Sequence, residues 1–350
     1  MNSIAPTPSI PVTLIMGDGI GPEIAEATIA VVNALGTGIE WEYREAGMAA
    51  VKLYNEPLPR DTMESIGRNR LALKGPLTTP VGGGYRSINV VLRKEFQLFA
   101  NIRPSRSFLP DGLFKDVDVV LIRENTEGLY VGVEHYIPIG DDPRAVAEAS
   151  GIITRFGCRR IAEFACQYAL KTGRKKITIV HKANILKALT GLFLETCQEV
   201  GRQYQDRLSI EERIIDNCAM QLVINPAQFD IILTTNMFGD ILSDECAGLI
   251  GGLGMAPGAN IGAEAAIFEA VHGSAPDIAG KGIANPTALM LAAALMLDHI
   301  HQHQNAERLR AAIKQILHED RVHTPDLGGE ATTMQYAEAV IQRLNQSGWS

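Results

Sequence analysis

The feature that most constrains the fold is a succession of short apolar runs, many of them followed by a segment with the composition of a helix. Residues 229–233 form one such run and predict a buried strand. Gly239 then gives the chain freedom to turn, and a helix is predicted to start at Asp240. Strands that alternate with helices predict an α/β fold. Further strands are predicted at residues 12–16, 39–44, 71–73, 117–122, 176–180, 210–215 and 267–271.

Length and charge limit the architecture and the partners. The 350 residues suffice for two domains or one large two-lobed unit. A hydrophobic fraction of 46% and a charged fraction of 21% are ordinary for a globular enzyme. The net charge of −8 argues against a nucleic-acid partner, so an anionic ligand would need a local cluster of Arg or Lys. The longest apolar run, residues 288–297, is too short to span a bilayer and is interpreted as a buried helix, so no membrane partner is expected.

The cysteines and the N-terminus bear on the cellular compartment. The five cysteines are scattered and include no CxxC pair, which suits reduced thiols. Residues 1–12 lack the basic and long apolar regions of a signal peptide. We therefore expect a cytoplasmic protein.

Two aspartates in the predicted helix suggest a metal site. Asp240 and Asp244 are four residues apart, so both carboxylates project from one helix face. A hard cation such as Mg²⁺ or Mn²⁺ prefers one or two carboxylates together with substrate oxygens. The alternative is a helix cap and a solvated acid favoured by the helix dipole, and the spacing alone does not decide between them. Asp216, which follows the predicted strand at residues 210–215, is a third acid at the end of an element.

Basic residues at the ends of apolar segments suggest an anion site. Arg93, Arg103 and Arg123 each follow or end such a segment, and three convergent guanidiniums could hold carboxylates bidentately. Three unrelated surface arginines are the alternative. Ser87 is a natural N-cap for the helix that contains Arg93. Lys182 follows a predicted strand and could act as an acid or a base if it is partly buried.

Two glycine-rich segments lack the spacing of a dinucleotide fingerprint. In residues 17–22 the third glycine falls one position early and Pro22 stands in its place, so we interpret the segment as a tight strand-to-helix turn. Residues 248–262 fail at Pro257. Residues 74–84 place a lysine and two threonines among glycines, which suits the close approach of a ligand, with a mobile loop as the alternative.

Two other segments complete the chain. Residues 131–149 are polar and are interpreted as an excursion from the main fold. His299, His301 and His303 lie at the end of a predicted helix, and we interpret them as surface residues or charge partners of the helix rather than as a metal site.

Together these segments resemble one family, the metal-dependent β-decarboxylating dehydrogenases that act on isocitrate, isopropylmalate and homoisocitrate. The resemblance covers nearly the whole chain, and several long motifs in the same order are more specific than any one motif. Ser87, Asn89 and Arg93 match the Ser-x-Asn-x-x-x-Arg pattern of the isocitrate enzymes, so the chain is most similar to the NAD-dependent isocitrate dehydrogenases. The motifs lie at residues 17–22, 74–76, 101–104, 123–128, 181–184, 239–244 and 272–277.

The resemblance implies a two-domain α/β fold that is not a Rossmann fold. A large domain would comprise residues 1–98 and 252–350, and a small domain would comprise residues 99–251. A clasp at about residues 131–150 of the small domain would help to form a homodimer with shared active sites.

The resemblance also implies roles for individual residues in binding isocitrate. Arg93, Arg103 and Arg123 would hold the α- and β-carboxylates of isocitrate, and Ser87 and Asn89 would bind its γ-carboxylate.

A second set would bind the metal, move protons and hold NAD. Asp240 and Asp244, with Asp216 of the partner subunit, would ligate Mg²⁺ or Mn²⁺. Lys182 of the partner subunit and Tyr130 would transfer protons in the oxidative decarboxylation of isocitrate to 2-oxoglutarate, a reaction of the tricarboxylic acid cycle. Residues near the nicotinamide would be Leu77, Thr78 and Thr79; those near the adenosine would be His272, Gly273, Ser274, Ala275, Asp277, Ile278, Ala284, Asn285 and Asp326.

Other functions are open at this point. A homoisocitrate or isopropylmalate dehydrogenase would share the fold, although Ser87 and Asn89 argue against it. A non-catalytic regulatory subunit should have lost catalytic or metal residues, and this chain retains them. An ordinary Rossmann hydroxyacid dehydrogenase is disfavoured by the glycine spacing.

The choice of cofactor depends on Asp277. Its carboxylate can accept hydrogen bonds from the ribose hydroxyls of NAD and would repel the 2′-phosphate of NADP. NADP enzymes of the same family carry Lys-Tyr where this chain has Asp277 and Ile278. The sequence therefore predicts a preference for NAD.

Overall fold

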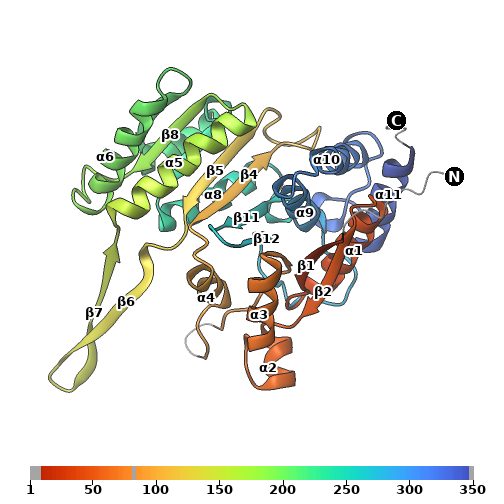
Figure 1. Cartoon of the computed structure of the whole chain (residues 1–350), viewed down its shortest axis with the longest axis horizontal. Coiled ribbons are helices and arrows are strands. Elements are labelled where there is room, and N and C mark those ends of the chain that lie inside the picture. The colour runs from red at the N-terminus through yellow and green to blue at the C-terminus, as the bar shows by residue number, and fades with distance from the viewer. Residues whose placement is uncertain (1–8, 81–83, 347–350) are drawn as a thin grey trace. The chain divides into compact units, whose positions relative to one another are not determined.

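The computed structural model describes residues 9–80 and 84–346, which form two compact units (Figure 1). The first unit comprises the described parts of residues 1–96, 107–115 and 250–350, and the second comprises residues 97–106 and 116–249. Each unit combines a set of paired strands with helices, so the predicted α/β class is confirmed. Residues 81–83, part of the predicted glycine-rich ligand segment, lie outside the described residues.

The strands of the first unit follow the order β2-β1-β3-β12-β11. The pairs β2–β1, β1–β3 and β3–β12 are parallel, and β11 is antiparallel to β12. These strands are β1 (Ile10–Ile15), β2 (Ile39–Arg44), β3 (Leu71–Lys74), β11 (Pro257–Ile261) and β12 (Ala266–Ala270).

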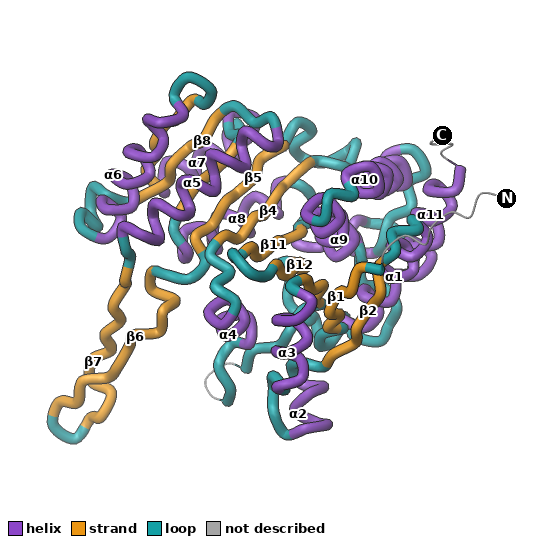
Figure 2. The backbone as a smooth tube through the Cα atoms, viewed as in Figure 1, coloured by secondary structure: helices purple, strands orange, loops and turns teal. Residues whose placement is uncertain are grey.

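Helices of the first unit pack on its strands through apolar side chains. Residues 287–294 are entirely buried because α9 packs on β11 and β12, so the longest apolar run is a buried helix as predicted. Helices α1, α9, α10 and α11 also pack against one another (Figure 2). The helices are α1 (Gly21–Ala34), α2 (Met48–Tyr54), α3 (Arg60–Asn69), α4 (Ile88–Glu95), α9 (Thr287–His299), α10 (His303–His318) and α11 (Thr333–Gln346).

The strands of the second unit follow the order β4-β5-β10-β8-β9. β4 is antiparallel to β5, and the remaining pairs are parallel. Helix α5 packs across β5, β10 and β8, whereas α8 packs against β4 and β5. The strands are β4 (Ala100–Arg106), β5 (Asp118–Glu124), β8 (Lys176–His181), β9 (Ser209–Ile214) and β10 (Ile231–Thr234); the helices are α5 (Arg155–Thr172), α6 (Leu189–Gly201), α7 (Ile215–Ile224) and α8 (Asn236–Leu249).

A separate hairpin belongs to the second unit. β6 (Gly128–Ile139) and β7 (Asp142–Ile152) pair antiparallel and extend away from the strands of their own unit (Figure 1). The predicted polar excursion is therefore a two-stranded ribbon, whose register shifts between Gly128 and Val133 and again between Ile137 and Ile139. Its side chains are exposed almost throughout, and they include Tyr136 and Ile139 at 56% and 62% exposure.

Some predicted boundaries are wrong. Helix α8 begins at Asn236 rather than at Asp240, so Gly239 lies inside the helix and does not turn the chain. Helix α2 was not predicted; it has only seven residues, between Gly47 and Asn55, which both have positive φ. The helix predicted to reach about residue 303 ends at His299.

The turn at residues 17–22 is confirmed. Gly17 has a φ of +87°, and α1 begins at Gly21 with Pro22 in its first turn. Among the histidines, His299 lies in the last turn of α9, with its ring 5.6 Å from that of Phe268, whereas His303 begins α10 and pairs with Asp298 at 3.0 Å. The position of a charge partner at the end of the predicted helix therefore fits His299 but not His303.

Two further observations concern the compartment. All five cysteines are free and buried. Over residues 9–80 and 84–346, we find no helix with both the length and the apolar character needed to cross a membrane.

Candidate functional site

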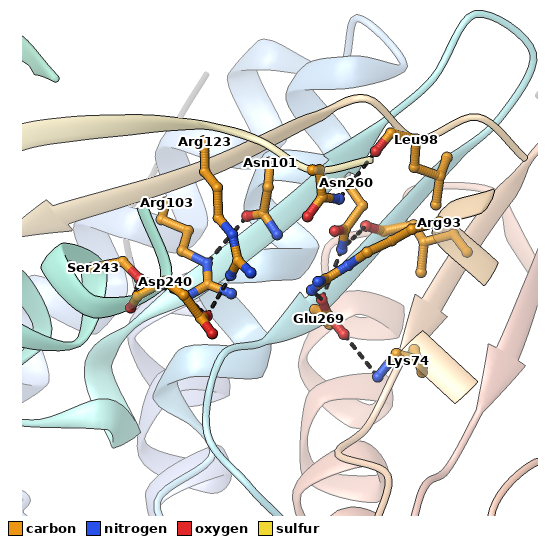
Figure 3. Close-up of polar contacts among 12 residues, drawn as sticks. Lys74, Arg93, Leu98, Asn101, Arg103, Arg123, Asp240, Ser243, Asn260 and Glu269 are labelled. Atoms are coloured by element: carbon orange, nitrogen blue, oxygen red, sulfur yellow. Dashed lines mark hydrogen bonds and ion pairs between the residues drawn. The ribbon is translucent and has the colours of Figure 1, made fainter. Parts of the chain in front are cut away.

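Arg103 and Arg123 converge on one carboxylate in the second unit (Figure 3). The antiparallel register places Asn101 of β4 opposite Arg123 of β5, so these residues and Arg103 share the region where α8 begins. Arg123 Nη1 donates to Asp240 Oδ1, and Arg103 Nη1 lies 3.4 Å from the same oxygen. Arg103 also donates to Ser243 Oγ at 2.5 Å. The two guanidiniums are thereby fixed beside a carboxylate on the first turns of a helix.

Asn236 holds Arg123 from the other side. Its Oδ1 accepts from Nε and Nη2 of Arg123 at 3.0 and 2.7 Å, and its Nδ2 donates to the backbone carbonyl of Glu127 at 3.1 Å. The Arg123 side chain is only 1% exposed, so these acceptors offset the cost of burying its charge. The sequence analysis missed Asn236, although its position at the start of the motif with Asp240 was the available signal.

Gly239 permits this arrangement by its lack of a side chain. A Cβ atom at residue 239 would lie 2.6 Å from Arg123 Cγ. The glycine is therefore required for the close approach of α8 to Arg123, not for a turn.

Asp240 and Asp244 lie on one face of α8, as their spacing predicts. Asp240 Oδ2 accepts from the Tyr130 hydroxyl at 2.9 Å, and Asp244 Oδ1 lies 3.9 Å from Arg103 Nη1. Burial raises the pKa of Asp244, and the charge of Asp240 adds to this against the opposing effect of Arg103. The side chains are 38% and 59% exposed, so both carboxylates can be reached from solvent.

This pair fits part of a site for a hard divalent cation. Two carboxylates suit Mg²⁺ or Mn²⁺, and a cation would offset both effects that raise the pKa of Asp244, namely burial and the neighbouring charge of Asp240. In the described part of the chain, no three His, Cys, Asp or Glu side chains are grouped so as to hold a metal. A cation bound here would therefore need further oxygens from a substrate, water or a second chain.

Lys182 and Asp216 form a second pair in the same unit. Lys182 follows β8, Asp216 lies in the first turn of α7 after β9, and their side chains are hydrogen-bonded. Lys182 is 27% exposed, which meets the condition of partial burial set by the sequence. Its hydrogen bond lowers the pKa of Asp216. Each predicted proton carrier is therefore hydrogen-bonded to a predicted metal ligand, Lys182 to Asp216 and Tyr130 to Asp240.

Arg93 of the first unit is held by a buried acid (Figure 3). Glu269 Oε1 lies 3.7 Å from Arg93 Nη2 and accepts from Asn260 Nδ2 at 2.7 Å, while Oε2 lies 2.7 Å from Lys74 Nζ. Burial would raise the pKa of Glu269, but Lys74 and Arg93 lower it to about 2. Sequence reasoning missed Glu269, for which the available signal was an acid inside the apolar run at residues 267–271.

Ser87 and Asn89 lie at the start of α4. Ser87 occupies the N-cap position, as predicted, but its side chain makes no capping hydrogen bond to the described residues. The side-chain oxygen of Asn89 is buried and has no hydrogen-bond partner in the part of the chain that is described. Helix capping therefore does not explain why residue 87 is a serine. The side-chain oxygen of Asn89 is left without a hydrogen bond to the described residues.

The predicted cofactor residues of the first unit make two groups of contacts. Thr78 and Ser274 hydroxyls lie 2.7 Å apart, which joins the nicotinamide and adenosine segments of the prediction. Asn285 Nδ2 donates to Asp326 Oδ2 at 3.0 Å. His272 belongs with the second group, because the charge of Asp326 acts on its ring. Asp277 is exposed and Leu77 is buried.

Comparisons with known proteins identify relatives over almost the full length. The family described as isocitrate/isopropylmalate dehydrogenase matches residues 11–340. The chain is 47% identical over 341 residues to the mitochondrial NAD isocitrate dehydrogenase catalytic subunit 5 of Arabidopsis thaliana, covering 97% of this chain and 89% of that protein. It is 47% identical over 338 residues to 3-isopropylmalate dehydrogenase of Methanothermobacter thermautotrophicus, covering 96% and 99%. Because these identities are equal, overall similarity does not choose between the two substrates.

A solved structure shows the same similarity in three dimensions. The crystal structure of isocitrate dehydrogenase from Methylococcus capsulatus matches with a TM-score of 0.93 and 52% sequence identity. The match covers 96% of this chain and 99% of that chain.

Substitution of Gly239 tests the close approach of α8 to Arg123. Gly239→Ala should lower the free energy of unfolding by about 1–3 kcal/mol, because the added methyl group overpacks against Arg123. In the same helix, Gly248 has open space around its Cβ position, so Gly248→Ala should stabilise the protein by up to about 1 kcal/mol. Urea unfolding of both variants measures the difference; equal stabilisation by both would contradict the packing argument.

The buried charge of Glu269 makes a prediction about pH. Its folded pKa of about 2 lies below the ordinary value of 4.5, so its contribution to stability is present above about pH 4.5 and is lost as the pH falls toward 2. Glu269→Gln should lower the free energy of unfolding at neutral pH by about 3 kcal/mol, and the difference should shrink as the pH falls through that range. Glu264→Gln is the control, because Glu264 is 73% exposed and should contribute little. Denaturant unfolding over this pH range provides the measurement, and a difference that is independent of pH would contradict the prediction.

Proposed function

Because this chain belongs to the isocitrate/isopropylmalate dehydrogenase family, we propose that it is a metal-dependent NAD isocitrate dehydrogenase. Family membership confirms the resemblance and the predicted fold type. The proposed reaction converts isocitrate to 2-oxoglutarate and CO₂ with reduction of NAD, as a step of the tricarboxylic acid cycle.

The start of α4 is the observation that favours isocitrate. Isocitrate carries a third carboxylate where isopropylmalate carries an apolar isopropyl group. The Ser87 hydroxyl caps nothing in the described chain, and the buried amide of Asn89 has an unpartnered atom. An amide carries both an acceptor oxygen and an N–H donor, and rotation about its last side-chain bond can turn the N–H group toward a carboxylate. An apolar substituent would leave both polar groups unsatisfied, whereas a carboxylate would pair with them.

The arginines supply charge for the other two carboxylates. Arg93, Arg103 and Arg123 are each held by a carboxylate of the chain, and Asn236 fixes Arg123 further. A guanidinium fixed before binding loses little conformational entropy when it binds a carboxylate. Ser87, Asn89 and Arg93 come from the first unit, and Arg103 and Arg123 come from the second.

The proposed chemistry needs a cation and two proton carriers. Asp240 and Asp244, with Asp216 of the partner subunit, would hold Mg²⁺ or Mn²⁺. When bound, the cation would supply positive charge beside the substrate oxygens, and NAD would supply an acceptor for the hydride of C2. Lys182 Nζ of the partner subunit takes the proton of the C2 hydroxyl. Tyr130 Oη, which is already hydrogen-bonded to Asp240, returns a proton to C3 after CO₂ has left.

A homodimer with shared sites follows from this assignment. Within one chain Lys182 and Asp216 contact each other, and Asp216 is 68% exposed, so both can serve a neighbouring chain. The exposed apolar residues of the β6–β7 hairpin, such as Ile139, support its proposed role as the dimer clasp.

The proposal also keeps the predicted domain boundaries, with a large domain of residues 1–98 and 252–350 and a small domain of residues 99–251. It also keeps a cytoplasmic location, which is supported by five free cysteines that suit a reducing compartment.

Isopropylmalate oxidation is the second candidate, because a 3-isopropylmalate dehydrogenase is equally identical to this chain. The purified protein should oxidise isocitrate at least about a hundredfold better, in kcat/KM, than isopropylmalate or homoisocitrate, since the polar groups of Ser87 and Asn89 would be left unpaired. Higher activity on isopropylmalate would overturn the assignment, and activity on none of the three substrates would favour a regulatory subunit.

The proposed metal site makes a separate prediction. Excess chelator or Asp240→Asn should abolish turnover, and added Mg²⁺ or Mn²⁺ should restore turnover only in the unmodified chain.

The preference for NAD rests on the loop at Asp277. Asp277 is exposed, so its carboxylate is available to a bound cofactor. Repulsion between Asp277 and a 2′-phosphate should favour NAD by about 2–4 kcal/mol, or roughly thirtyfold to a thousandfold. Asp277→Lys with Ile278→Tyr should narrow or reverse this preference through the KM for the cofactor while the KM for isocitrate stays constant. Equal use of NAD and NADP by the unmodified protein would show that Asp277 merely belongs to a turn.

A further inference from the structure

The glycine-rich turn at residues 17–22 contains a buried acid that the proposed function does not use. Asp18 is 6% exposed, and its two carboxylate oxygens accept from different backbone amides. Oδ1 accepts from Met48 N at 2.8 Å, and Oδ2 accepts from Thr78 N at 2.8 Å. One side chain thus ties the turn to the start of α2 and to the segment predicted to lie near the nicotinamide.

Backbone contacts of the same turn reach a third segment. Asp18 N donates to Pro76 O at 2.7 Å, and Ile20 N donates to Ser274 O at 2.9 Å. These approaches need glycines, because a Cβ at Gly17 would lie 2.4 Å from Pro76 O and a Cβ at Gly19 would lie 1.9 Å from Ser274 O. Gly17 and Gly19, which do not fit the spacing of a dinucleotide fingerprint, therefore permit close backbone contacts within the first unit.

The two segments that meet at this turn also contact each other. Thr78 Oγ1 and Ser274 Oγ lie 2.7 Å apart, and Tyr85 donates its hydroxyl to the Thr78 carbonyl at 3.0 Å. Since Asp18 fixes the Thr78 amide and the neighbouring backbone fixes Ser274, the relative position of the two hydroxyls depends on this turn.

We propose that Asp18 is a positioning residue for the cofactor: it holds Thr78 in register with Ser274, so that the segments predicted to bind the two halves of NAD are fixed before NAD arrives. This inference rests on the proposed function, which assigns both segments to NAD. A carboxylate is required because both oxygens must accept. In Asp18→Asn, one amide N–H would face a backbone N–H at 2.8 Å, where no hydrogen bond can form.

The test compares Asp18→Asn with Asp230→Asn. Asp230 lies in the second unit, and its Oδ2 likewise accepts from two backbone amides, Lys175 N at 2.7 Å and Lys176 N at 3.0 Å. In Asp230→Asn the side-chain oxygen can still accept from both amides, while the ion pair of Asp230 with Arg174 is lost. This variant therefore controls for the loss of a buried carboxylate charge, because only Asp18 touches the predicted cofactor segments.

In the Asp18→Asn protein, the KM for NAD and the dissociation constant of NADH, measured by its fluorescence, should rise about tenfold, the factor that corresponds to one hydrogen bond to a charged group. The KM for isocitrate should change less than about twofold, because the arginines are untouched. Amide hydrogen exchange at Met48 and Thr78 should accelerate. The Asp230→Asn protein should lose stability but keep its affinity for NADH.

Several outcomes would overturn the proposal. These are unchanged NADH binding in Asp18→Asn, an equal loss of NADH affinity in Asp230→Asn, or no binding of NADH by the unmodified chain. If Asp18→Asn does not fold, Asp18→Ser replaces it and should show the same direction of change. The binding and exchange measurements need no turnover, so failure of the unmodified chain to oxidise isocitrate would refute the proposed function while leaving the role of Asp18 to be decided by NADH.

Discussion

A buried guanidinium needs a fixed set of acceptors, and Arg123 obtains them from the first turns of α8. Asn236 binds two of its nitrogens, Asp240 binds a third, and Gly239 gives the side chain room to lie against the helix. Removal of any one acceptor would weaken the compensation of a buried charge, which is more costly than the loss of an ordinary hydrogen bond. The start of α8, the end of β5 and the placement of Asp240 therefore depend on one another.

The first unit also buries a charged side chain, but there the buried charge is negative. Here the buried group is the Glu269 carboxylate, and Lys74, Arg93 and Asn260 surround it. In both units an arginine proposed to bind substrate is therefore held by an acid of the protein itself. Such an arginine keeps its geometry in the free protein, although part of its charge is already compensated.

The sequence predicts elements better than it predicts contacts. Apolar runs located most strands within a few residues, and the motifs identified the family. The sequence places the start of α8 too late because glycine commonly marks a turn, whereas Gly239 is required by the side chain of Arg123, more than a hundred positions earlier. Asn236, Glu269 and Asp18 were missed for the same reason. Their partners are distant in sequence, and no periodicity records a hydrogen bond across β-strands or loops.

The β6–β7 hairpin has a consequence for how the protein assembles. A two-stranded hairpin is only marginally stable by itself in water, and most side chains of this one are exposed. In the proposed homodimer, its order in solution would therefore be acquired largely when the second chain covers Tyr136, Ile139 and their neighbours. Folding of this segment would then be a bimolecular event, so the amount of ordered ribbon, unlike the stability of either unit, would vary with the concentration of the protein.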